Sequence, residues 1–134
     1  VELELEELMT RPDGPFVALN LNRYRERAAY PAGTPDGAVS GREAYMRYGM
    51  VAMRTVYRTG GHLLFTGRIL SVLREPKAGP TIGRWDEVAA MRYPNPPAIL
   101  SMEHAPDYRA ALDDRDAGLE RTLVIATTPA TLGI

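Results

Sequence analysis

The chain has 134 residues, of which 45% are hydrophobic and 25% are charged. This length and composition are typical of one globular domain with a packed core, and they exclude a disordered chain. Sixteen basic and seventeen acidic side chains leave a net charge of −1, which argues against a dedicated nucleic-acid binder, because such proteins gain affinity by neutralising phosphates.

The composition also limits the chemistry and the location of the protein. There is no cysteine, so a disulfide, a thiol nucleophile and a thiolate metal site are excluded. No apolar run has the length of a membrane-spanning helix, and we expect no membrane partner. Residues 1–4 lack the basic and apolar pattern of a signal peptide, although a chain that opens on valine leaves room for a removed leader. A cytoplasmic location is the default expectation.

Residues 1–15 are predicted to form an N-terminal extension, and residues 16–134 a single domain. The apolar residues of the extension fit one face of a helix as well as a strand, and we interpret them as a short helix that lies on the domain. A break at Pro12-Asp13-Gly14-Pro15 separates the extension from the domain.

The segment Phe16–Tyr24 alternates as a strand does, and its two faces differ. One face is wholly apolar, and we expect it to pack against helices; it consists of Val17, Leu19 and Leu21. The opposite face carries Ala18, Asn20 and Asn22. The loop 25–39 that follows is longer than most connections in compact domains, and such loops are often lids, binding segments or disordered.

The first main helix is predicted from the capping box Ser40-Gly41-Arg42-Glu43 to about Thr59, where Gly60-Gly61 ends it. The remaining elements are predicted as strands over His62–Leu73 and Arg84–Tyr93, a helix after the cap Asn95, a second helix from about Asp107 to Gly118 beyond the break at Pro106, and a strand over Leu123–Thr128. This order is the ferredoxin-like βαββαβ plan of the α+β class, with a four-stranded antiparallel sheet and helices on one face. The other face needs a cover, and a second copy of the chain is the simplest one.

Several separated motifs carry a family resemblance: Gly41-Arg-Glu-Ala-Tyr45 with Tyr48, the Gly60-Gly61 pair, Gly67, Trp85-Asp86, Tyr93-Pro94, and Asp107-Tyr108 with Arg115. Together they resemble the domain-of-unknown-function family thirteen-thirty of the dimeric α/β-barrel superfamily, over about Phe16 to Thr128. The resemblance implies a subunit that dimerises by laying two sheets face to face into a barrel. The family carries no agreed activity, while the superfamily includes cofactor-independent monooxygenases, lyases, isomerases, haem-using enzymes and ligand-sensing domains.

Four residues are candidates for ligand binding, each with a structural alternative. Asn20 is an amide inside a strand, where it could line a ligand pocket, form hydrogen bonds across a hydrated dimer interface, or lie near the open end of the strand. His62 follows a diglycine and could act as an acid, a base or an axial ligand, or it could be a half-exposed histidine at a strand end. Trp85 suits a ligand wall or ordinary packing. Arg23 could seat an anion at the mouth of the long loop or could lie in solvent.

Other charged residues fit surface or structural roles. Arg115 in Asp113-Asp-Arg-Asp116 is expected in surface ion pairs, and His104 at the surface. Arg68 and Arg92 lie inside strand patterns and are better candidates for burial against a carboxylate or a ligand.

Several standard sites are absent from the sequence. No serine lies in the nucleophile elbow of a hydrolase, no phosphate loop or dinucleotide fingerprint occurs, and the two histidines lack metal-ligand spacing. We therefore predict no metal site and no cofactor. The leading hypothesis is a homodimer that binds a small organic molecule in a pocket built by Asn20, Arg23, His62 and Trp85, either as a binding protein or as a cofactor-independent monooxygenase, lyase or isomerase. The alternative is a non-catalytic dimerisation or interaction module.

Overall fold

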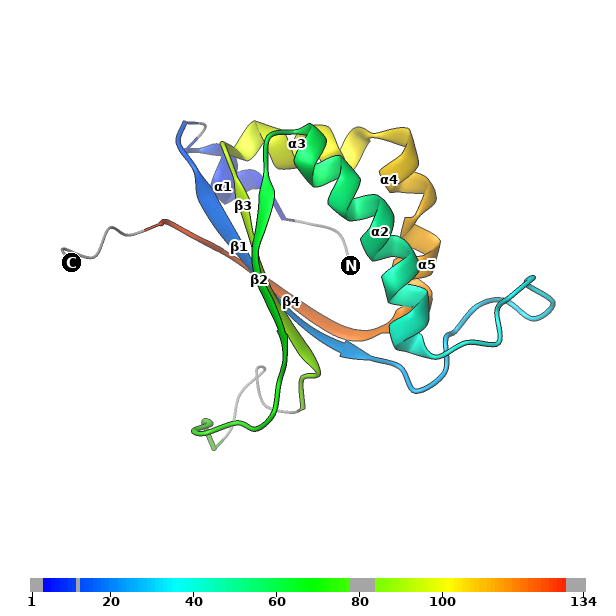
Figure 1. The fold of residues 1–134 in the computed structure, drawn as a ribbon. Helices are drawn as coiled ribbons and strands as arrows, with labels where there is room; N and C mark the ends of the chain where they lie inside the picture. The colour runs from blue at the N-terminus through cyan, green and yellow to red at the C-terminus, as the bar shows by residue number, and fades with distance from the viewer. Residues whose placement is uncertain (1–3, 12, 78–83, 130–134) are drawn as a thin grey trace.

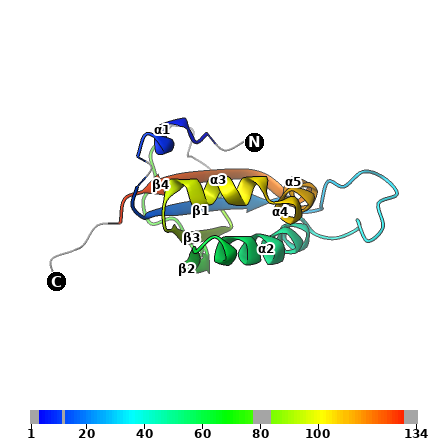
Figure 2. The same ribbon diagram turned by 90° about the horizontal axis from the view of Figure 1, so that it is seen from above.

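The computed structural model describes residues 4–11, 13–77 and 84–129. Its centre is a four-stranded antiparallel sheet in the order β2-β3-β1-β4. The strands are β1 (Phe16–Tyr24), β2 (His62–Arg68), β3 (Glu87–Tyr93) and β4 (Leu119–Thr127). The main helices form one layer on a single face of this sheet (Figure 1, Figure 2). The predicted α+β class and the ferredoxin-like plan are confirmed.

Local signals in the sequence set the ends of the helices. Helix α2 (Gly41–Arg58) begins where the Ser40 side chain accepts a hydrogen bond from the Glu43 backbone N–H at 3.1 Å, and Gly60 follows it with a φ of 90°. Helix α3 (Pro96–His104) begins where the Asn95 side chain accepts from the Ala98 N–H at 3.0 Å. Short helices α1 (Glu6–Met9), α4 (Pro106–Ala110) and α5 (Leu112–Gly118) complete the set in the described residues.

Several boundaries differ from the predicted ones because strands are defined by pairing. The second strand ends at Arg68, the last residue that pairs with β3, although the apolar pattern runs on to Leu73. Leu70 and Leu73 are consequently 97% and 95% exposed. The third strand starts at Glu87 rather than Arg84, and the last at Leu119 rather than Leu123. The helix predicted over 107–118 is divided at residue 111 into α4 and α5.

The orientation of β1 is opposite to the prediction. Phe16 and Ala18 are buried in the core, and the face that they share with Asn20 and Asn22 points toward the helices. The wholly apolar row of Val17, Leu19 and Leu21 therefore lies on the other face, which no helix of the described residues covers. Alternation shows that the two faces of a strand differ, but not which of them meets the helices.

The core lies between the helical layer and one half of the sheet. It contains these buried side chains: Phe16, Ala18, Tyr48, Ala52, Val56, Tyr93, Ala98, Ile99, Met102, Tyr108 and Ala111. The rings of Phe16 and Tyr93 stack across β1 and β3 with their centroids 5.1 Å apart. Helices supply most of these apolar side chains. The core is therefore still well packed although β1 places the amides Asn20 and Asn22 on the same face.

Two glycines fix how the helices sit over the sheet. Gly41 at the start of α2 and Gly118 at the end of α5 are buried against each other, and a Cβ at Gly118 would meet the Gly41 carbonyl oxygen and lie 2.8 Å from the Tyr45 backbone nitrogen. Their close approach brings Tyr45 and Tyr48 of α2 near the side chains of α5. None of the helices in the described ranges is both long and apolar enough to cross a membrane.

Candidate functional site

Two adjoining cavities lie between the helix-facing side of the sheet and the helices. The first has a volume of about 390 Å³ and lies beneath α3, α4 and α5, beside β1 and β4; the second, of about 500 Å³, lies between α2 and the strands β2 and β3. Six residues line both: Asn20, Asn22, Tyr45, Tyr48, Tyr93 and Met102. A ligand could therefore contact both cavities at once.

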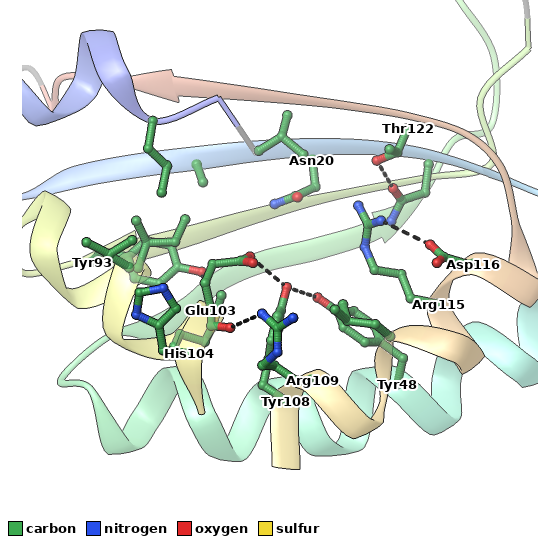
Figure 3. A pocket seen from close by; sticks show the side chains of 18 of the residues that line it. Asn20, Tyr48, Tyr93, Glu103, His104, Tyr108, Arg109, Arg115, Asp116 and Thr122 are labelled. Carbon is green, nitrogen blue, oxygen red and sulfur yellow. Dashed lines mark hydrogen bonds and ion pairs between the residues drawn. The ribbon is translucent and has the colours of Figure 1, made fainter. Parts of the chain in front are cut away.

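A chain of hydrogen bonds crosses the first cavity, as Figure 3 shows. The Tyr108 hydroxyl donates to Glu103 Oε1 at 3.1 Å, and the hydroxyls of Tyr48 and Tyr108 lie 3.1 Å apart. Because Tyr108 has one hydroxyl proton and gives it to Glu103, Tyr48 is the donor to Tyr108. The chain thus runs in one direction, from Tyr48 through Tyr108 to a carboxylate at the cavity.

Burial keeps the tyrosines of this region protonated. Desolvation raises the pKa of Tyr45 to about 12, and it also raises the pKa of Tyr48 and of Tyr108 above the ordinary value. Neutral phenols are hydrogen-bond donors at neutral pH. Tyr48 and Tyr108 can therefore act as hydrogen-bond donors in the chain that ends at Glu103.

Arg115 of α5 brings a positive charge into the first cavity. Its side chain is only 14% exposed, and its guanidinium lies 5.9 Å from the centre of the Tyr48 ring. The nearest carboxylate is that of Asp116, at 3.8 Å, which is itself 67% exposed. This arginine was predicted to join surface ion pairs: the ion pair with Asp116 is present, but the surface location was wrong, because the Arg115 side chain points inward from the helix.

Amides of β1 form another wall of the first cavity. The Asn22 side chain is buried and accepts a hydrogen bond from Thr122 Oγ1 at 2.8 Å. The Asn20 side chain points into the cavity (Figure 3), and it forms no hydrogen bond with any group in the described part of the chain. Asn20 is thus able to donate to a ligand and to accept from one.

The second cavity is mostly apolar. Its lining includes five of the six methionines of the chain: Met46, Met50, Met53, Met91 and Met102. Methionine side chains are flexible and polarisable, so such a surface adapts to apolar groups of varied shape.

At one end of the second cavity, buried Glu87 accepts a hydrogen bond from Arg42 Nε at 2.6 Å. Arg68, which was expected to be buried, is 69% exposed and lies 4.0 Å from the same carboxylate.

The structure separates the four predicted ligand-binding residues. Asn20 lines both cavities. Arg23 forms an ion pair with Glu120, and the ring of Trp85 lies 4.8 Å from the Arg121 guanidinium. His62 is opposite Arg92, at the other end of the sheet. Arg23, His62 and Trp85 line neither cavity, so a ligand-binding role for them stays a prediction.

The sequence did contain a weak signal for the residues that the prediction omitted. Tyr108, Leu112 and Arg115 follow one another at spacings of four and three, which is the spacing of residues on one side of a helix. The other two residues on that side, Tyr108 and Leu112, are uncharged, as is typical of a side that faces the core. Arg115 therefore shares the inward stripe with Tyr108. Tyr48 was among the motifs of the family resemblance, whereas Glu103 gave no signal, since it looks like an ordinary helical residue. The loop 25–39 contributes no residue to either cavity.

No family model matches the chain, and no curated protein matches it. Two solved structures match it over nearly its whole length. The crystal structure of methylated RPA0582 has 32% sequence identity and a TM-score of 0.80, covering 98% of this chain and 96% of that one. RPA0582 of Rhodopseudomonas palustris, a protein of unknown function, also matches at 31% identity and a TM-score of 0.79, with 97% of each chain covered. The chain belongs to the RPA0582 family.

More distant structures agree with the RPA0582 family in fold alone. A DABB-family protein with a ferredoxin-like fold from Mesorhizobium loti has 16% identity and a TM-score of 0.53, covering 89% of this chain and 100% of that one. At3g17210 from Arabidopsis thaliana has 12% identity and the same TM-score, with 89% and 99% covered. The expected ferredoxin-like relationship is thus confirmed, while membership of family thirteen-thirty stays a prediction.

Proposed function

We propose that this protein is a homodimeric binding protein for a small organic molecule, which it holds between the sheet and the helices. One observation carries the proposal: a polar cavity with Asn20, Glu103 and Arg115 on its walls adjoins an apolar, methionine-rich cavity. Ligand sites in proteins are commonly concave and largely apolar, with a few convergent polar groups that fix the orientation of the ligand. Both features are present here in one continuous region.

A specific observation supports an enzymatic role as well. The chain from Tyr48 through Tyr108 to Glu103 places a carboxylate and two neutral phenols at the cavity. A carboxylate and a phenol can exchange a proton with a bound molecule and need no cofactor for it. Among the reaction types that the family resemblance implies, isomerases and lyases depend on this kind of proton transfer.

The uncovered face of the sheet supports the homodimer. Directly paired residues form one apolar row across all four strands, consisting of Phe65, Ala90, Leu19 and Ile125. A second such row contains Val88, Leu21 and Leu123. Phe65 and Ile125 are 58% and 42% exposed in the single chain. A second copy laid on this face would remove the two rows from water.

Native mass spectrometry followed by a thermal-shift screen of small organic molecules tests the proposal. We expect a dimer, and we expect some compounds to raise the melting temperature of the wild-type protein. The substitutions Asn20→Ala and Glu103→Gln should remove most of that increase, because both side chains line the first cavity. Glu26→Gln is the matched control, since Glu26 is exposed and lies outside both cavities.

Two results would contradict the proposal. If no compound stabilises the wild-type protein, or if Asn20→Ala and Glu103→Gln are stabilised as much as Glu26→Gln, the cavities are not the binding site. The non-catalytic interaction module then becomes the better interpretation. Circular dichroism of each variant establishes that it is folded before its response is compared.

A further inference from the structure

We propose that the ligand is an organic carboxylate with an apolar body, whose carboxylate pairs with Arg115 while its body extends along α2 into the methionine-rich cavity. This inference rests on the proposed small-molecule function and adds the chemical class of the ligand. It depends on the state of Arg115, on the groups around it and on the shape of the combined cavity.

Arg115 has binding capacity that the described protein groups do not use. A guanidinium has five N–H donors in a planar fork that matches a carboxylate. Its nearest carboxylate partner, Asp116, lies at 3.8 Å, which is beyond hydrogen-bonding distance. Burying a charge at 14% exposure is costly unless a close partner compensates for the lost water. A ligand carboxylate would supply that partner.

Besides the Asp116 carboxylate, Arg115 has the neutral phenol of Tyr48 near it, and the two amides of β1 line the same cavity. Asn22 uses its side-chain oxygen to accept from Thr122, and its side chain also interacts with the hydroxyls of Tyr24 and Tyr45. Asn20, which is free of hydrogen bonds within the described residues, points into the same space (Figure 3). Donors that converge beside one buried cation favour an anion.

Among the described residues that line the first cavity, Arg115 is the buried cation, and this favours a carboxylate over a phosphate. Arg109, the other arginine of the first cavity, is exposed, and its guanidinium contacts the backbone carbonyl of Glu103 at 3.5 Å. A phosphate group carries between one and two negative charges at neutral pH, and Glu103 and Asp116 already place carboxylates in the lining of this cavity. A carboxylate, with one negative charge, balances Arg115 alone.

The remainder of the ligand follows from the second cavity. Tyr45, Tyr48 and Tyr93 line the passage between the two cavities, and methionines line the space beyond it. Aromatic rings and thioethers accept flat or flexible apolar groups. The expected ligand is therefore amphipathic, with its charge at the α5 end and its apolar part beneath α2.

The test compares phenylbutyrate with phenylbutyramide, a pair that differs in the negative charge and hardly in size. Isothermal titration calorimetry measures both dissociation constants for the wild-type dimer and for three variants: Arg115→Gln, Arg115→Lys and Arg54→Gln.

We expect the wild-type protein to bind the acid at least ~10-fold more tightly than the amide, since hydrogen bonds between charged groups are about twice as strong as neutral ones. Arg115→Gln should abolish that preference, and Arg115→Lys should keep part of it because the charge remains without the fork. Arg54→Gln should behave as the wild type does, because Arg54 is exposed and outside both cavities.

Each contrary outcome identifies what has failed. If the acid and the amide bind the wild-type protein equally, or if Arg115→Gln keeps the preference for the acid, the carboxylate class is wrong and the small-molecule function stands. If neither compound binds, the proposed ligand class is also wrong, and the thermal-shift screen with Asn20→Ala and Glu103→Gln decides the function independently. The Arg115→Lys variant keeps the test informative if Arg115→Gln does not fold.

Discussion

Five tyrosine side chains line the two cavities, and burial sets their chemistry. They are Tyr24, Tyr45, Tyr48, Tyr93 and Tyr108. Desolvation is the largest cause of the raised pKa of each of them. A phenol that stays neutral donates one hydrogen bond and places no negative charge beside Glu103. At the scale of single residues, the cavities therefore place neutral tyrosine hydroxyls beside the charged side chains of Glu103 and Arg115.

The raised tyrosine pKa values predict a loss of stability at alkaline pH. The pKa of Tyr45 is about 12 in the folded protein and about 10 in an unfolded chain, so the folded state holds this proton more tightly. Its contribution to the free energy of unfolding is complete below pH ~10 and is lost as the pH rises from there toward the folded-state pKa. Urea titrations at a series of alkaline pH values measure the decline, and Tyr45→Phe should make it shallower.

The matched control for this prediction is Tyr57→Phe. Tyr57 lies on the same helix and is 58% exposed, so its replacement should leave the pH dependence of the free energy of unfolding as it is in the wild type. A wild-type free energy of unfolding that stays constant from pH ~9 to ~12 would show that burial does not hold these phenols neutral.

Helices α2 and α5 meet through glycine, and this contact determines where Tyr48 and Arg115 lie relative to each other. The Arg25 backbone N–H donates to the Gly118 carbonyl at 2.8 Å, and the Gly41 N–H donates to the Arg25 carbonyl at 3.1 Å. Backbone thus packs on backbone at this point, with no room for a side chain. At the scale of elements, the first cavity depends on the approach of α2 to α5.

The substitution Gly118→Ala should destabilise the protein by at least ~2 kcal/mol, because its Cβ would contact the backbone of Gly41 and Tyr45 and push the helices apart. Gly49→Ala on α2 is the control: a Cβ there meets no atom within 4 Å, and alanine is a better helix former. We expect Gly49→Ala to stabilise the protein by ~0.5–1 kcal/mol. Chemical denaturation measures both changes, and equal effects of the two substitutions would contradict this account.

Within the described part of the chain, helices cover one face of the sheet and leave the other face uncovered. Helices cover the face that carries Phe16, Ala18 and the two amides of β1, while the apolar rows around Leu19 and Leu21 lie on the other face. Contiguous exposed apolar surfaces of this kind commonly mark sites of association in proteins. At this scale, the proposed dimer would bury the apolar face of the sheet that a single copy leaves exposed.

We predict that Ile125→Asp converts the dimer into a monomer. Ile125 lies on the uncovered face, paired with Leu19, and is 42% exposed in the single chain, so an aspartate costs the isolated subunit little but would bury a charge in the dimer. Light scattering coupled to size exclusion should give about twice the chain mass of 14.8 kDa for the wild type and the chain mass itself for the variant. Tyr57→Glu, on the helical side of the molecule, should remain a dimer. A wild-type protein that elutes as a monomer would overturn the proposed dimer itself.

Much of the fold could be predicted because the signals act within a few residues. The Ser40–Glu43 capping box, the Asn95 cap before two prolines and the alternation of Phe16–Tyr24 each depend on neighbouring backbone groups. Boundaries were less accurate where they depend on a partner: β2 ends where β3 stops pairing with it, whatever its own pattern of side chains.

The sequence by itself determined the elements, their order and the existence of one polar and one apolar face on β1. Only the tertiary structure decided which face meets the helices, and it brought Tyr48 and Tyr108 together across 60 residues of sequence. It likewise turned Arg115 from an expected surface residue into the cation of the cavity. The physical reason is that helix caps and strand alternation depend on residues close in the sequence, whereas the burial of a side chain depends on how segments distant in the sequence pack against one another.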